Sequence, residues 1–189
     1  MFKDLFNTTI LLIFNPSEAW RMLAGKRTDD NEKFLSGFVY PFIGLITIAA
    51  FLGVLFTRKE FDVQIALKAA ILALLSAFGG FFLASYLLNE VWRSLFKQEK
   101  NMKLCQNFVG YSSALMFSLN ILLSLLPEFF FLRFFVLYTI YIVWEGAIPY
   151  MGVKEPEQLK FVSFATVIIV ATPFMLEFIL RLLMPGLRF

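Results

Sequence analysis

Five long apolar stretches constrain this chain more than any other feature. They cover about residues 35–57, 65–92, 104–126, 129–148 and 161–184. A helix needs about 20 apolar residues to cross the roughly 30 Å hydrocarbon layer of a bilayer, and each stretch meets or nearly meets that length. Because 59% of the residues are hydrophobic and only 16% are charged, too few polar side chains remain to cover a water-soluble domain. We therefore predict an all-α integral membrane protein whose five transmembrane helices form one domain over residues 35–189.

Residues 1–34 are predicted to form an N-terminal amphipathic interfacial segment. The sequence Asn15-Pro16-Ser17-Glu18 supplies a cap residue, a proline at the first helical position and a glutamate three residues after the cap, which is typical of a helix start. Apolar side chains that can face lipid are Phe2, Leu5, Phe6, Ile13, Trp20 and Leu23, and basic ones that can meet anionic headgroups are Lys3, Arg21, Lys26 and Arg27. The alternative is that the segment packs under the bundle as ordinary protein core, and the two readings stay open.

The distribution of lysine and arginine predicts the orientation, because basic residues near short loops resist translocation. If the N-terminus is cytoplasmic, the cytoplasmic segments hold Lys3, Arg21, Lys26, Arg27, Lys33, Arg93, Lys97, Lys100, Lys103, Lys154 and Lys160. The outer segments then hold only Arg58, Lys59, Arg181 and Arg188. We therefore expect a cytoplasmic N-terminus and an outside C-terminus.

Small residues line one face of the second apolar stretch. They recur at alternating steps of four and three residues: Ala66, Ala70, Ala73, Ala77, Gly80 and Ala84. Because lipid provides no hydrophobic drive between helices, close approach across small side chains is what lets them associate. We interpret this face as a helix-packing seam and place the second helix at the centre of the bundle.

The sequence offers little for catalysis. It has no histidine and a single cysteine, Cys105, so that the commonest proton shuttle, an internal disulfide and a thiolate metal site are excluded. Phosphate-binding and dinucleotide fingerprints are absent, and Gly110-Tyr111-Ser112 lacks the second glycine of a nucleophile elbow. Basic residues are spread along the chain rather than gathered for nucleic acid. We expect a non-enzymatic protein with no catalytic residues, no metal, no cofactor and no nucleic-acid partner.

Four polar residues are predicted to lie in the cytoplasmic third of the membrane, each on a different helix: Tyr40, Glu90, Tyr111 and Glu145. A charge inside the membrane costs about 2.5–3.5 kcal/mol on insertion scales and normally has a partner or a task. One hypothesis is a polar pocket for a cation, a lipid headgroup or a partner helix. The other is that both glutamates snorkel to the interface beside Trp92 and Trp144.

Polar residues toward the outer side are given structural roles. Glu177 and Arg181 are four residues apart, so they can pair on one helix face. Arg133 can reach the headgroups from the outer end of its helix, and Asn120 is interpreted as a hydrogen-bonding residue between helices.

Several segments resemble the Yip family of five-pass, Ypt- or Rab-interacting membrane proteins, and more closely its bacterial branch. They are residues 12–20, Tyr40-Pro41, Gly110-Tyr111-Ser112, and residues 141–164 with Trp144-Glu145-Gly146 and residues 151–156. Two positions depart from the eukaryotic pattern, because Gly37-Phe38-Val39 has no acidic residue and Ser113-Ala114-Leu115 has no proline. A Rab GTPase is therefore not an expected partner.

The resemblance implies a non-enzymatic scaffold or adaptor in membrane organisation or protein trafficking. We expect it in a bacterial cytoplasmic membrane, in contact with lipids and with membrane-protein partners or a second copy of the chain. The alternative is a small channel or transporter that uses the polar residues of the inner leaflet. Transport predicts a hydrated path, whereas scaffolding predicts a sealed core. Transporters commonly contain internal repeats, and none is visible here.

Overall fold

Helices make up almost all of the chain in the computed structural model, which describes residues 2–26, 31–57 and 62–184. No strand occurs within these ranges. In chain order the elements are α1 (Phe2–Phe14), α2 (Pro16–Gly25), α3 (Asn31–Phe34), η1 (Leu35–Val39), α4 (Tyr40–Thr57), α5 (Val63–Phe96), α6 (Met102–Ser112), α7 (Ala114–Leu125), η2 (Pro127–Tyr138), α8 (Thr139–Ala147), η3 (Glu155–Glu157) and α9 (Gln158–Leu183).

Among the described residues, four helical stretches are long and apolar enough to cross a membrane: Asn31–Phe56, Val63–Phe96, Pro127–Ala147 and Glu155–Leu183. A fifth crossing is formed if the bent pair α6 and α7 is counted as one span. The predicted fold class, an all-α multi-pass membrane protein, is confirmed. Each of the five predicted apolar stretches coincides with one of these units, with boundaries that differ by a few residues.

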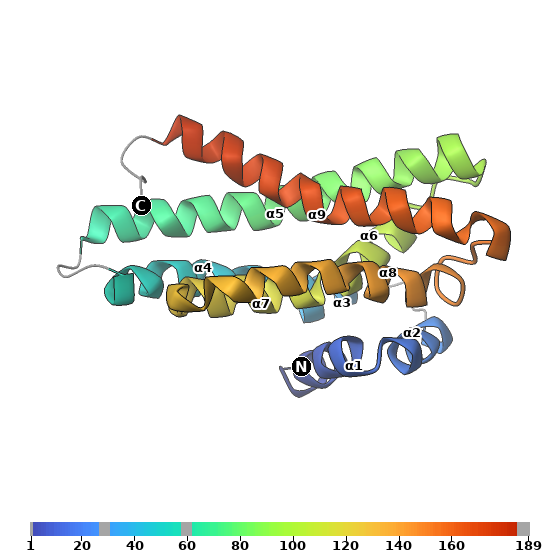
Figure 1. Ribbon diagram of the computed structural model, residues 1–189, viewed down its shortest axis with the longest axis horizontal. Helices are drawn as coiled ribbons and strands as arrows, with labels where there is room; N and C mark the ends of the chain where they lie inside the picture. The colour runs from blue at the N-terminus through green and yellow to red at the C-terminus, as the bar shows by residue number, and fades with distance from the viewer. Residues whose placement is uncertain (1, 27–30, 58–61, 185–189) are drawn as a thin grey trace.

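The helices run roughly along one axis, with α5 and α9 side by side over much of their length (Figure 1). We call the left end of Figure 1 the α4–α5 end, because α4 ends and α5 begins there, α7 turns into η2, and α9 ends. The opposite end, the α5–α6 end, holds the connections from α5 to α6 and from α8 to α9. The short helices α1 and α2 lie on the flank of the bundle in the half near the α5–α6 end.

The first crossing begins with a wide helical turn that accommodates Pro41. A proline has no N–H to donate and its ring pushes against the carbonyl four residues earlier, which here belongs to Gly37. Leu35–Val39, the five residues before Tyr40, form a π-helical turn. The Tyr40 N–H donates to the Leu35 carbonyl, five residues earlier. A π-bulge of this kind inserts an extra residue without ending the helix. The sequence analysis did not predict this π turn.

The third crossing is bent by 46° where α6 meets α7. Ser113 joins them with φ −82° and ψ −2°, and its N–H donates to the Val109 carbonyl at 2.9 Å. The fourth crossing starts as the 3₁₀ segment η2 directly after the turn at Leu126 and Pro127. Phe129, with φ −85° and ψ 29°, interrupts the regular helix near the start of η2. The sequence predicted both crossings, but neither the bend nor the 3₁₀ segment.

The small-residue seam of α5 is buried against its neighbours. Ala66, Ala70, Ala77, Gly80 and Ala84 are buried and Ala73 is half-buried. At Gly80 the approach is closest, because a methyl group built there would lie 2.8 Å from Cβ and 2.9 Å from Cα of Pro173 on α9. Only a residue without a side chain permits this contact, so the seam positions α9 directly on α5.

The N-terminal segment packs partly as protein core. Leu5, Leu12, Trp20 and Leu23 are buried, and α2 packs on α8 while α1 contacts α6, α7 and η1. Trp20 and Leu23 therefore face protein rather than lipid, as the alternative interpretation of this segment expected. A second row on α1 remains exposed, with Phe2 and Phe6 at 64% and Phe14 at 80%. Asn15 caps α2 as the sequence predicted, accepting from the Glu18 N–H and donating to its carboxylate at 2.7 Å.

Candidate functional site

A large cavity among the described residues lies between α4, α5, α7, η2 and α9, in the half of the bundle near the α4–α5 end. Its volume is about 740 Å³. The apolar part of its wall comes from Ile46, Ala50, Gly53, Val54, Ala69, Leu72, Ala73, Ala77, Leu119, Leu123, Pro127, Val136 and Phe174. A volume of this size falls within the range of about 300–1,000 Å³ that is typical of ligand pockets.

Six polar side chains also line this cavity: Ser76, Asn120, Ser124, Arg133, Glu177 and Arg181. Glu177 and Arg181 form the ion pair that their spacing predicted, with Arg181 Nη2 at 2.6 Å and Nε at 3.0 Å from Glu177 Oε1. Arg133 makes no ion pair with any described residue, and Asn120 makes no hydrogen bond with one. Both side chains are exposed and line the cavity. The bond across helices that was predicted for Asn120 is therefore not formed with any described residue, although Glu177 of α9 lines the same cavity.

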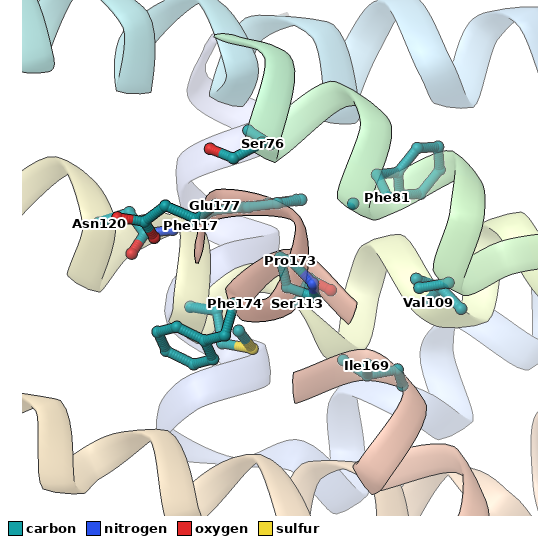
Figure 2. Close-up of a pocket in the computed structure, with 14 residues that line it drawn as sticks. Ser76, Phe81, Val109, Ser113, Phe117, Asn120, Ile169, Pro173, Phe174 and Glu177 are labelled. Atoms are coloured by element: carbon teal, nitrogen blue, oxygen red, sulfur yellow. The ribbon is translucent and has the colours of Figure 1, made fainter. Parts of the chain in front are cut away.

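Toward the middle of the bundle lies a second, smaller space of about 30 Å³, which we call the narrow part. It adjoins the cavity, because Ser76, Ala77, Asn120, Phe174 and Glu177 line both. Figure 2 shows Ser76, Asn120 and Glu177 gathered on one side of the narrow part and Phe81, Val109 and Ile169 on the other. The deep end of the cavity is therefore polar on one side and apolar on the other.

Aromatic side chains fill the half of the bundle near the α5–α6 end. We call them the aromatic cluster, and they are Trp20, Phe34, Phe38, Trp92, Phe96, Phe108, Tyr111, Tyr150 and Phe161. Trp20 stacks on Phe108 at 5.1 Å between ring centroids and lies 5.0 Å from Tyr150. Trp20, Phe108 and Phe161 have no exposed surface. Rings packed at such spacings leave no room for a row of waters.

The four residues of the predicted inner pocket have four different surroundings. Tyr40 is 44% exposed and stacks on Phe78 of α5, whereas Tyr111 belongs to the aromatic cluster. Glu90 forms an ion pair with Lys100 in the α5–α6 connection. Glu145 is half-buried on α8, one turn or so from Tyr138 and Tyr141. These neighbours do not support a pocket shared by all four residues, and that pocket stays a prediction.

The cavity was not found from the sequence, although four of its six polar residues were given structural roles. Their convergence depends on how α9, η2 and α7 are placed relative to one another. An intramembrane charge without a partner on its own helix is the signal that singles out Arg133. The cavity offers one carboxylate, two guanidinium groups, one amide and two hydroxyls. No group of three or more His, Cys, Asp or Glu that could hold a metal ion occurs among the described residues.

Comparison with known proteins gives one match. The sequence matches a family model, Yip1, described as the Yip1 domain, over residues 10–177. No curated protein and no solved structure matches the chain. The matched region starts within α1 and ends at Glu177 in α9, so that it includes the aromatic cluster and most of the cavity lining.

Proposed function

The chain belongs to the Yip1-domain family, and from this premise we propose that it is a non-enzymatic membrane scaffold or adaptor in membrane organisation or protein trafficking. The proposal is that the folded bundle offers a binding surface at its cytoplasmic end and conducts nothing through its centre. Its contacts would be membrane lipids and other membrane proteins or a second copy of the chain. A bacterial cytoplasmic membrane is the location proposed for it.

The aromatic cluster is the observation that carries this proposal. A channel or transporter needs a hydrated path across the bundle, whereas three of the rings, Trp20, Phe108 and Phe161, have no exposed surface. The cavity in the other half adjoins only a small space of about 30 Å³ toward the middle of the bundle, one side of which is lined by Phe81, Val109 and Ile169. These features favour a sealed core and therefore a role in binding over a role in transport.

The proposed orientation places the α5–α6 end in the cytoplasm. The described basic residues near this end include Arg93, Lys97, Lys100, Lys103, Lys154 and Lys160. Those near the α4–α5 end are Lys68, Arg133 and Arg181. The excess of basic residues at the α5–α6 end is what the positive-inside rule requires of a cytoplasmic end. Arg27, Arg58, Lys59 and Arg188, which also entered the prediction, lie outside the described residues.

Reconstitution into liposomes separates the scaffold from the channel. We expect the purified protein to give ion flux no higher than that of protein-free liposomes. Flux that falls in Glu90→Gln or Glu145→Gln would instead establish the alternative, since a conduction path through the inner leaflet would use these carboxylates.

Site-specific crosslinking tests the binding role directly. A photoreactive residue at Arg93, which is exposed near the α5–α6 end, should capture protein partners in cells. The same residue at Leu182, which is 70% exposed on α9 near the other end, is the matched control and should capture mainly lipid. Equal protein capture at both positions, or none at Arg93, would contradict a cytoplasmic binding face.

A further inference from the structure

The cavity near the α4–α5 end combines a cationic group without a protein partner with a wide apolar wall. We infer that it binds a single anionic phospholipid, with the headgroup phosphate on Arg133 and an acyl chain along the apolar wall. This goes beyond a scaffold role, because a scaffold needs no lipid at this site. The ligand class follows from the charge, from the polar groups that lack partners, and from the shape and surroundings of the cavity.

The charge of the lining favours an anion. Arg133 and Arg181 supply two positive charges against the single carboxylate of Glu177. The Glu177 carboxylate already accepts two hydrogen bonds from Arg181, so that this pair is internally compensated. Arg133 remains as the uncompensated charge. A guanidinium group presents a planar set of donors that matches two phosphate oxygens at once.

The polar groups of the cavity lie on helices that cross the membrane, where hydrocarbon cannot satisfy them. A charged side chain on such a helix carries an insertion cost that is lower toward the headgroups, and an unsatisfied amide also carries a penalty. Arg133 and Asn120 have no partner among the described residues and both face the cavity. A ligand that supplies acceptors to both would remove these penalties.

The apolar wall and the surroundings favour a lipid over a free phosphate ion. Most of the lining residues are apolar, and α9 and η2, which contribute to the lining, also carry exposed large apolar side chains. On α9 these include Phe178, which is 64% exposed, and on η2 Phe134, which is 75% exposed. The acyl chains of neighbouring lipids therefore adjoin the cavity. An amphiphile enters it from the side without leaving the bilayer.

The test uses the full-length protein in nanodiscs of phosphatidylcholine that contain a small fraction of phosphatidylglycerol, with retained lipid measured by native mass spectrometry after release. We expect one phosphatidylglycerol to stay bound. In Arg133→Gln its retention should fall about tenfold, because a hydrogen bond to a charged group contributes on that order. Arg93→Gln removes an exposed cation that does not line the cavity and should leave retention unchanged.

A second variant tests the apolar wall without changing charge. Ala69 lines the cavity and is half-buried, so that Ala69→Phe fills part of the space. It should also reduce retention, with thermal stability measured beside it to show that the bundle is intact. Equal retention in wild type, Arg133→Gln and Ala69→Phe would overturn the proposal, since the lipid would then be an ordinary neighbour of the bundle. Displacement by inorganic phosphate alone would overturn it too, in favour of a soluble anion.

These outcomes are independent of the scaffold proposal. Loss of the bound lipid in Arg133→Gln is measured on purified protein and does not involve a protein partner. Partner capture at Arg93 is measured in cells and does not involve the cavity. Either result can fail while the other stands.

Discussion

Trp20 is fully buried, and its Nε1–H donates a 2.8 Å hydrogen bond to the carbonyl of Ile142 on α8. The indole lies against Gly146, where a methyl group would approach its ring carbons to within 2.8 Å or less. Gly146 on α8 thus leaves space for the Trp20 side chain on α2. This contact attaches the N-terminal segment to the bundle and completes the aromatic cluster.

Replacing Trp20 therefore has a predictable cost. Trp20→Ala should destabilise the protein by about 3–5 kcal/mol, since it removes a large buried side chain. Trp20→Phe keeps a ring but leaves the Ile142 carbonyl without its donor, for a loss of about 1–3 kcal/mol. Thermal unfolding in detergent measures both. Trp144→Phe is the control because Trp144 is 38% exposed, and an alanine variant at Trp20 as stable as wild type would refute this role.

The contact between α5 and α9 gives a matched pair of substitutions. At Gly80 an added methyl group meets Cα and Cβ of Pro173, which cannot move without the helix. At Gly79 it meets only Cδ2 of Leu176, the end of a flexible side chain. Gly80→Ala should cost about 1–3 kcal/mol by overpacking and Gly79→Ala much less. Thermal unfolding of the two variants side by side measures both costs. A larger cost for Gly79→Ala than for Gly80→Ala would mean that α5 and α9 are further apart at Gly80 than the structure has them.

Some residue-level features could be predicted from the sequence, and others could not. The Glu177–Arg181 pair and the Asn15 cap are local, because both partners lie within four residues on one helix. The small-residue seam of α5 could be predicted from the spacing of its residues alone. The surroundings of Asn120 could not be predicted, since they depend on the distance between α7 and α9, which no single helix determines.

At the level of elements, departures from regular α-helix explain how the bundle closes. The π turn before Pro41 and the 3₁₀ segment η2 adjust the start of the first and fourth crossings. The 46° bend at Ser113 redirects α7 away from the direction of α6. Apolar length predicted each crossing. It did not predict the bend, because Ser112-Ser113-Ala114 contains neither proline nor glycine to indicate one.

The start of α2 is the element whose local stability is easiest to test. Asn15→Ala removes the side-chain acceptor for the Glu18 N–H and should weaken the first turn by about 1 kcal/mol. Amide hydrogen exchange in residues 16–20 should then become about fivefold faster. Asn7→Ala, at an exposed position on α1, should leave exchange in α2 unchanged. Unaltered exchange in Asn15→Ala would show that tertiary packing alone maintains the turn.

For the molecule as a whole, the two halves of the bundle differ. The half near the α5–α6 end is filled by the aromatic cluster, whereas the other half encloses a cavity of about 740 Å³. The sequence predicted the number of crossings and the placement of charge. It did not predict this asymmetry, because aromatic and small residues occur in both halves and only their packing decides which half is full.

Thiol labelling across the membrane tests this asymmetry most directly. Asn120→Cys places a thiol inside the cavity, and the native Cys105 is fully buried, so the wild-type protein is its own control. A membrane-impermeant thiol reagent is added to intact cells, where it meets the outer face, and to inverted membrane vesicles, where it meets the cytoplasmic face. We expect Asn120→Cys to be labelled in cells and not in inverted vesicles, and the wild type in neither. Labelling of the variant from the cytoplasmic face, alone or together with labelling from the outer face, would contradict a bundle that the aromatic cluster closes at its α5–α6 end.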